Sequence, residues 1–101
     1  MNIEIKEENG HVRALLAGRL DTAASVEAAP QFKELNDKAD KEVILDFASL
    51  EYISSSGLRL LIGLRKASES KGGHLVIEHI NDAIRNVFVM TGFLNLFDIK
   101  D

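Results

Sequence analysis

The chain has 101 residues, 46% of them hydrophobic and 28% charged, a composition typical of a single globular domain. Twelve basic residues against sixteen acidic ones give a net charge of −4, which argues against direct nucleic-acid binding. The chain has no cysteine, so it has no disulfide and no thiolate metal site. It also has no signal peptide and no apolar run of membrane length, so we expect a cytoplasmic protein with no membrane insertion.

The start of the chain predicts a β-hairpin followed by a helix. Residues 1–7 alternate apolar and polar side chains, as in a half-buried strand. Asn9-Gly10 supplies the positive-φ pair of a tight turn, and residues 11–17 form the returning strand. The strand then breaks, and either Asp21 or Thr22 can cap the helix that follows.

The first helix is expected within residues 24–39. Its apolar face consists of Ala24, Ala28, Phe32, Leu35 and Ala39. Pro30 lies inside this pattern, and proline is well tolerated only in the first turn of a helix. Either the helix begins near Ala29 or it is kinked at Pro30, and the sequence leaves both possibilities open.

A strand, a serine-rich junction and a second helix follow. Residues 43–47 form a short apolar run, which is typical of a strand covered on both faces. After a loop, three consecutive serines (residues 54–56) open a helix that runs to about Ser70, and Gly72 ends it. A serine at a helix start can accept a hydrogen bond from a free amide, and an anion is stabilised at the same place.

The rest of the chain completes an α/β fold. Residues 74–80 form another strand, and the strand–helix–strand spacing predicts that it runs parallel to residues 43–47. Asn81 caps a third helix that Gly92 ends, and residues 93–99 form a last short strand or a packed tail. We expect one domain over residues 1–101, with a mixed sheet of four or five strands and about three packed helices.

These elements and three of their motifs resemble the STAS domain, the module of bacterial anti-sigma factor antagonists, over essentially the whole chain. The family pattern is an apolar strand ending in Asp, a loop, and Asp-Ser-Ser-Gly-Leu. This chain has residues 43–46 and then residues 54–58, Ser-Ser-Ser-Gly-Leu. Residues 18–21 and 90–93 are similar to two further segments of the family.

The resemblance implies that Ser55 is a phosphorylation site, with Ser56 as the second serine of the family pair. Ser54 replaces the family Asp, so one carboxylate is absent from the motif. Ser54 and Ser56 remain alternative acceptors. Because Asp21 and Asp46 end predicted strands, they are expected beside the junction. The expected surround of the phosphosite is therefore Asp21, Asp46, Ser54, Ser56 and Gly57.

On a helical wheel, the second helix has two distinct faces. One face is expected to pack on the sheet and contains Leu60, Leu61, Leu64 and Ala67. The other face starts at Ser55 and mixes cations with aliphatic side chains, as protein interfaces do. Its predicted partner-binding residues are Leu58, Arg59, Ile62 and Lys66. An amphipathic helix with a wide apolar arc and no binding role is the alternative.

The resemblance implies a partner-switching function. The unphosphorylated form would bind an anti-sigma factor that is also a serine kinase, and so release the sigma factor. Phosphorylation of Ser55 would block binding, and a serine phosphatase would restore it. In such proteins the kinase partner binds the ATP, so we expect no cofactor in this chain. We also expect no metal site, and we expect the free chain to be a monomer. The alternative is a non-phosphorylated STAS subunit of a lipid-transport ATPase complex or a signalling scaffold, which the serine at position 54 leaves open.

An enzyme is not expected. A serine nucleophile needs a base and an oxyanion hole, and residues 54–58 do not match the Gly-x-Ser-x-Gly motif of hydrolases. His11, His74 and His79 fall within or at the start of predicted strands, and their spacing does not form a metal-binding set.

Overall fold

Five strands form one sheet in the computed structural model, which describes residues 1–100. The order β1-β2-β3-β4-β5 follows the chain. The strand β1 runs antiparallel to β2, and every other neighbouring pair is parallel. This confirms the predicted mixed sheet. The strands are β1 (Asn2–Glu8), β2 (His11–Leu20), β3 (Glu42–Ile53), β4 (His74–Glu78) and β5 (Asp98–Lys100).

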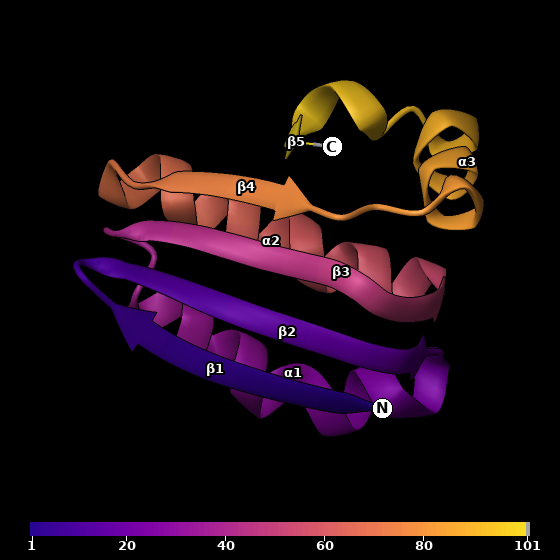
Figure 1. The fold of residues 1–101 in the computed structure, drawn as a ribbon, viewed down its shortest axis with the longest axis horizontal. Helices are drawn as coiled ribbons and strands as arrows, with labels where there is room; N and C mark the ends of the chain where they lie inside the picture. The colour runs from indigo at the N-terminus through magenta and orange to yellow at the C-terminus, as the bar shows by residue number, and fades with distance from the viewer. Residues whose placement is uncertain (101) are drawn as a thin grey trace.

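Two long helices cover one face of the sheet, as Figure 1 shows behind the strands. The helices are α1 (Thr22–Asp37), α2 (Ser55–Lys71) and α3 (Asp82–Thr91), followed by the short 3-10 helix η1 (Leu94–Leu96). The helices α1 and α2 pack side by side, and α3 lies beyond the carboxyl end of β4 (Figure 1). Among the described residues, no helix crosses the opposite face of the sheet in this view (Figure 1).

Each of the three helices begins with a polar side chain that accepts a hydrogen bond from a backbone amide three residues on. The side-chain oxygens of Asp21, Ser54 and Asn81 accept these bonds at the starts of α1, α2 and α3. Such caps stabilise a helix by about 1 kcal/mol each. Because the capping residues stand directly after a strand or within three residues of its end, the three helix starts lie towards the carboxyl ends of the strands.

Pro30 lies in the interior of α1 rather than at its start. The helix begins at Thr22, because Asp21 Oδ1 accepts a hydrogen bond from the Ala24 amide at 2.8 Å. Ser25 and Ala28 are buried, so the turn before the proline is held by packing. The expectation that the helix begins near Ala29 is therefore wrong. The ring of Pro30 is exposed, and it costs the helix one amide hydrogen bond.

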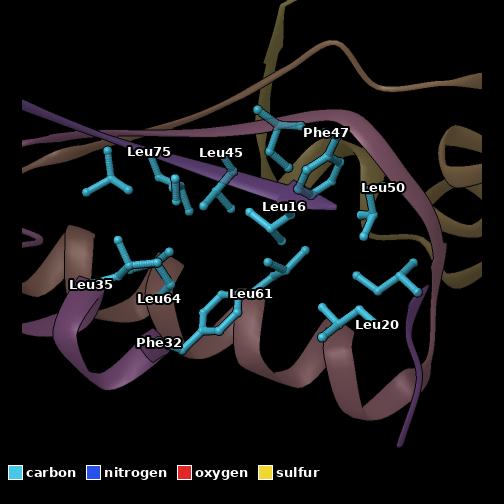
Figure 2. Close-up of a cluster of buried hydrophobic side chains, with 14 of the residues drawn as sticks. Leu16, Leu20, Phe32, Leu35, Leu45, Phe47, Leu50, Leu61, Leu64 and Leu75 are labelled. Atoms are coloured by element: carbon cyan, nitrogen blue, oxygen red, sulfur yellow. The ribbon is translucent and has the colours of Figure 1, made fainter. Parts of the chain in front are cut away.

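The core fills the space between the sheet and the two long helices. Figure 2 shows leucine and phenylalanine side chains from both layers meeting there. From the sheet come Leu16, Leu45, Phe47 and Leu50, and from the helices come Phe32, Leu35, Leu61 and Leu64, all at most 2% exposed. Burying one such side chain stabilises the fold by about 1.5–3 kcal/mol. The helix faces predicted from the apolar spacing are therefore largely the faces that pack.

The strand β3 is longer than the sequence predicted, because the expected loop after Phe47 is extended and continues to pair with β2 as far as Leu20 and Ile53. Register shifts between Leu15 and Ala17, and between Gly18 and Arg19, accommodate the added length. The buried side chains of Leu50 and Ile53 hold this part of the strand against the core.

Candidate functional site

The starts of α1 and α2 lie next to each other at one edge of the sheet. The Ser54 amide donates a hydrogen bond to the Leu20 carbonyl at 2.9 Å, which ties the end of β3 to the end of β2. Asp21 and Ser55 follow directly as the residues that open the two helices. The prediction that Asp21 lies near the serine junction agrees with this arrangement.

The three junction serines have different environments. The Ser54 hydroxyl accepts a hydrogen bond from the Gly57 amide at 3.1 Å, and Ser54 is only 9% exposed. Ser55, the first residue of α2, is exposed, and Ser56 is half-buried. An aspartate at position 54 could make the same capping bond through its carboxylate. Serine thus retains the cap without the charge, and Ser55 is the most accessible hydroxyl of the three.

Gly57 allows α2 to approach the ends of β2 and β3 closely. A Cβ atom at this position would lie 2.9 Å from Leu20 Cγ and 2.9 Å from Ile53 Cγ1. Both side chains are buried, so neither can move away easily. The glycine therefore fixes where the first turn of α2, and with it Ser55, sits on the edge of the sheet.

We expect Gly57→Ala to lower the free energy of unfolding by about 1–3 kcal/mol, because overpacking of a filled core has this cost. The matched control is Gly63→Ala in the same helix, where the added Cβ would have no neighbour within 4 Å. That control should raise stability by about 0.5–1 kcal/mol, since alanine favours a helix interior over glycine. Urea unfolding followed by circular dichroism measures both values, and equal changes in the two variants would contradict the close approach at Gly57.

Leu58 does not belong to the exposed surface. It is 3% exposed and packs in the core with Leu61 and Leu64, so its predicted partner-binding role is wrong. On the helical wheel Leu58 lies at the border of the predicted binding face. The buried side of α2 is wide enough to include this position. Leu60, which was expected to pack on the sheet, is only half-buried.

The other three residues of the predicted partner-binding surface are at least partly exposed. Arg59 and Lys66 are exposed, and Ile62 is half-buried. Within residues 1–100, neither Arg59 nor Lys66 forms an ion pair or a side-chain hydrogen bond. Both cations are therefore available to a partner.

Asp46 lies far from the serine junction, so its predicted place in the phosphosite surround is wrong. It stands seven residues before Ile53 in the extended strand β3, roughly 23 Å away at 3.3 Å per residue. Its side chain is an ion-pair partner of Arg13 at 3.3 Å, and Arg13 also contacts Glu78 at 2.9 Å. The hydrogen bond to Glu78, together with the two carboxylate charges, raises the pKa of Arg13. The Asp46 carboxylate thus pairs across the strands of the sheet.

Arg19 and Tyr52, which the sequence patterns did not indicate, lie at the same end of the sheet as the serine junction. The guanidinium carbon of Arg19 lies 4.5 Å from the centroid of the Tyr52 ring, a cation–π contact between the neighbouring ends of β2 and β3. Arg19 and Tyr52 are both exposed. The pair arises from the extra length of β3, which the apolar pattern did not predict.

Within residues 1–100, no three His, Asp or Glu side chains are grouped so that they could hold a metal ion. None of the described helices is long and apolar enough to cross a membrane.

Comparison with known proteins identifies relatives along the whole chain. The STAS domain family model matches residues 2–101. BtrV of Bordetella bronchiseptica, provisionally named an anti-sigma factor antagonist, is 30% identical over 101 residues, which is 100% of this chain and 87% of BtrV. The anti-sigma-B factor antagonist of Bacillus subtilis is 27% identical over 105 residues, covering 99% of this chain and 91% of that protein.

Solved structures share the fold. The anti-sigma factor antagonist SpoIIAA in its unphosphorylated form aligns with a TM-score of 0.75 at 20% identity, covering 99% of this chain and 88% of that chain. The phosphorylated form of SpoIIAA, a Bacillus cell fate determinant, aligns with a TM-score of 0.73 at 20% identity, covering 99% and 92%.

Proposed function

The chain belongs to the STAS domain family, and we propose that it is an anti-sigma factor antagonist controlled by phosphorylation of Ser55. The unphosphorylated form binds an anti-sigma factor that is also a serine kinase, and binding releases the sigma factor. Phosphorylation of Ser55 blocks binding, and a serine phosphatase restores it. The chain acts in the cytoplasm, as a monomer when free, through binding rather than catalysis.

The observation that carries this proposal is the exposure of Ser55 at the first position of α2, between a buried Ser54 and a half-buried Ser56. A kinase can reach this hydroxyl without unfolding the helix start. The added phosphate carries a charge of about −1.5 to −2 at neutral pH, which the first turn of a helix tolerates. SpoIIAA, which is similar in fold, is described in both forms.

The blocking effect follows from where the phosphate would stand. Arg59 lies one helical turn after Ser55, and Ile62 and Lys66 continue along α2. A partner that covers this surface must place atoms close to Ser55. A phosphate there obstructs the partner by its volume and repels any acidic group of the partner, so no large change in shape is required.

A sigma-release assay tests this function with single substitutions. Ser55→Ala should displace the sigma factor as well as the wild-type protein does and should stay active in the presence of kinase and ATP, because it lacks the acceptor. Ser55→Asp should bind the anti-sigma factor about tenfold more weakly, a loss of about 1.4 kcal/mol, since one carboxylate imitates phosphate only in part. The control is Ser70→Asp, which adds the same charge at an exposed position near the other end of α2. Wild-type affinity for Ser55→Asp, or an equal loss for Ser70→Asp, would contradict the switch.

A second candidate function rests on Ser54. Its neutral hydroxyl takes the place of the family carboxylate, and a kinase that reads this carboxylate would not modify the chain. The protein would then serve as a non-phosphorylated subunit of a lipid-transport ATPase complex or a signalling scaffold. Copurification with a transporter ATPase, together with no binding to an anti-sigma factor, would favour this function over the first.

A further inference from the structure

An apolar depression of about 360 Å³ opens between the first turns of α1 and α2. Its lining comes from both helices: Thr22, Ser25, Val26, Ala29, Ser56 and Leu60. Val26 is 73% exposed and, within residues 1–100, is the one strongly exposed large aliphatic residue of α1 and α2. The depression reaches Ser56, directly beside Ser55. It therefore adjoins the exposed face of α2 that carries Arg59.

The surface of α2 differs in charge from the rest of the protein. The helix has four basic residues and one acidic residue, a net charge of +3, whereas the whole chain carries −4. Two of the basic residues are engaged, since Arg65 pairs with Glu69 and Lys71 donates to the Asn36 carbonyl. The other two, Arg59 and Lys66, are exposed and without a partner among residues 1–100.

Neither cation lines the depression, but both lie on the strip of α2 beside it. Arg59 stands three residues after Ser56 and next to Leu60, so it lies on the adjoining strip of the helix surface. Lys66 continues that strip about two turns further on. An apolar hollow with unpaired cations on the neighbouring strip of the same helix matches a segment with an apolar side chain and carboxylates further along it.

We infer that the depression between α1 and α2 binds an apolar side chain of the anti-sigma factor, on a segment whose carboxylates pair with Arg59 and Lys66. This inference rests on the proposed function and adds α1, through Val26 and Ala29, to the binding surface. It also gives the Ser55 phosphate a specific effect. A phosphate one turn from Arg59 repels the acidic segment and competes with it for the same guanidinium.

The test measures the affinity of the purified cognate anti-sigma factor by titration calorimetry. Val26→Asp should weaken binding at least tenfold, because it places a carboxylate in the apolar hollow and opposite an acidic segment. Val89→Asp is the matched control, since Val89 is an exposed valine (55%) on α3. It should change the affinity less than twofold. Raising the salt concentration from about 0.1 M to 0.5 M should weaken wild-type binding several-fold, because salt screens the ion pairs.

The results that would overturn the inference differ from the result that would overturn the proposed function. Equal affinities for Val26→Asp and the wild-type protein would overturn the inference and leave the proposed function standing, provided that Ser55→Asp still binds weakly. Equal losses in the Val26 and Val89 variants would also overturn it. If light scattering showed a wild-type dimer that Val26→Asp abolishes, the depression would bind a second copy and the inference would be wrong. If no anti-sigma factor binds the unphosphorylated protein, the proposed function itself fails.

Discussion

Replacing Gly73 with alanine is expected to lower the free energy of unfolding by about 3 kcal/mol or more. A Cβ atom at this position would lie 1.9 Å from the Ala39 carbonyl oxygen and 2.7 Å from that of Lys41. Both are backbone atoms of the connection between α1 and β3, so relief requires the chain to move. Total stabilities of small domains are about 5–15 kcal/mol, so this loss is a large share. Urea denaturation measures it.

The neighbouring glycine provides a control. Gly72 ends α2 with φ of +74°, and a Cβ atom there would meet nothing within 4 Å. Gly72→Ala should therefore cost only about 1–2 kcal/mol, the backbone strain of an L residue in the left-handed region. If Gly73→Ala were no more destabilising than Gly72→Ala, the close approach of β4's start to the α1–β3 connection would be refuted.

Arg59→Glu is expected to weaken binding of the anti-sigma factor by about 30- to 100-fold, or about 2–2.7 kcal/mol. The substitution removes an unpaired cation and, in the proposed complex, places a negative charge opposite the carboxylates inferred for the partner. The melting temperature should change by only a few degrees, because Arg59 is exposed and has no ion-pair partner among residues 1–100. Titration calorimetry and thermal unfolding measure the two effects on the same sample.

The control for this charge reversal is Lys6→Glu. Lys6 is an exposed residue of β1, whose only ion pair in the described part of the chain is a 3.7 Å contact with Glu4, and the net charge changes by the same amount. A binding loss specific to Arg59 would assign the effect to the face of α2. Comparable losses in both variants would mean that overall charge governs association and that Arg59 makes no specific contact.

Local signals predicted much of this fold. The positive-φ glycines at the ends of α2 and α3, Gly72 and Gly92, and the cap at Asn81 each act within a few residues, so sequence spacing was sufficient. The parallel pairing of β3 with β4 followed from the helix between them. The exposure of Ser55 agrees with the helical wheel, which places it on the same face of the second helix as Arg59 and Lys66. In these cases the determining signals lie within one element or in consecutive elements of the chain.

The wrong predictions for Leu58 and Asp46 concern contacts between segments that are distant along the chain. The burial of Leu58 depends on how α2 is rotated against the sheet, which a helical wheel does not determine. The position of Asp46 depended on where β3 ends, and pairing with β2 extends that strand well beyond its apolar run. The depression beside Val26 requires α1 and α2 to pack side by side. No pattern within a single helix predicts that arrangement.

If Ser55 is the residue that switches partner binding, its modification alone should change the affinity for the anti-sigma factor. The protein is incubated with its cognate anti-sigma factor kinase and ATP, the phosphate is located by mass spectrometry, and the modified protein is titrated with the anti-sigma factor. We expect phosphate on Ser55 and an affinity at least a hundredfold below that of the unmodified protein, a loss of about 2.7 kcal/mol. Phosphate on Ser54 or Ser56 alone, or a protein phosphorylated at Ser55 that binds with unchanged affinity, would contradict it.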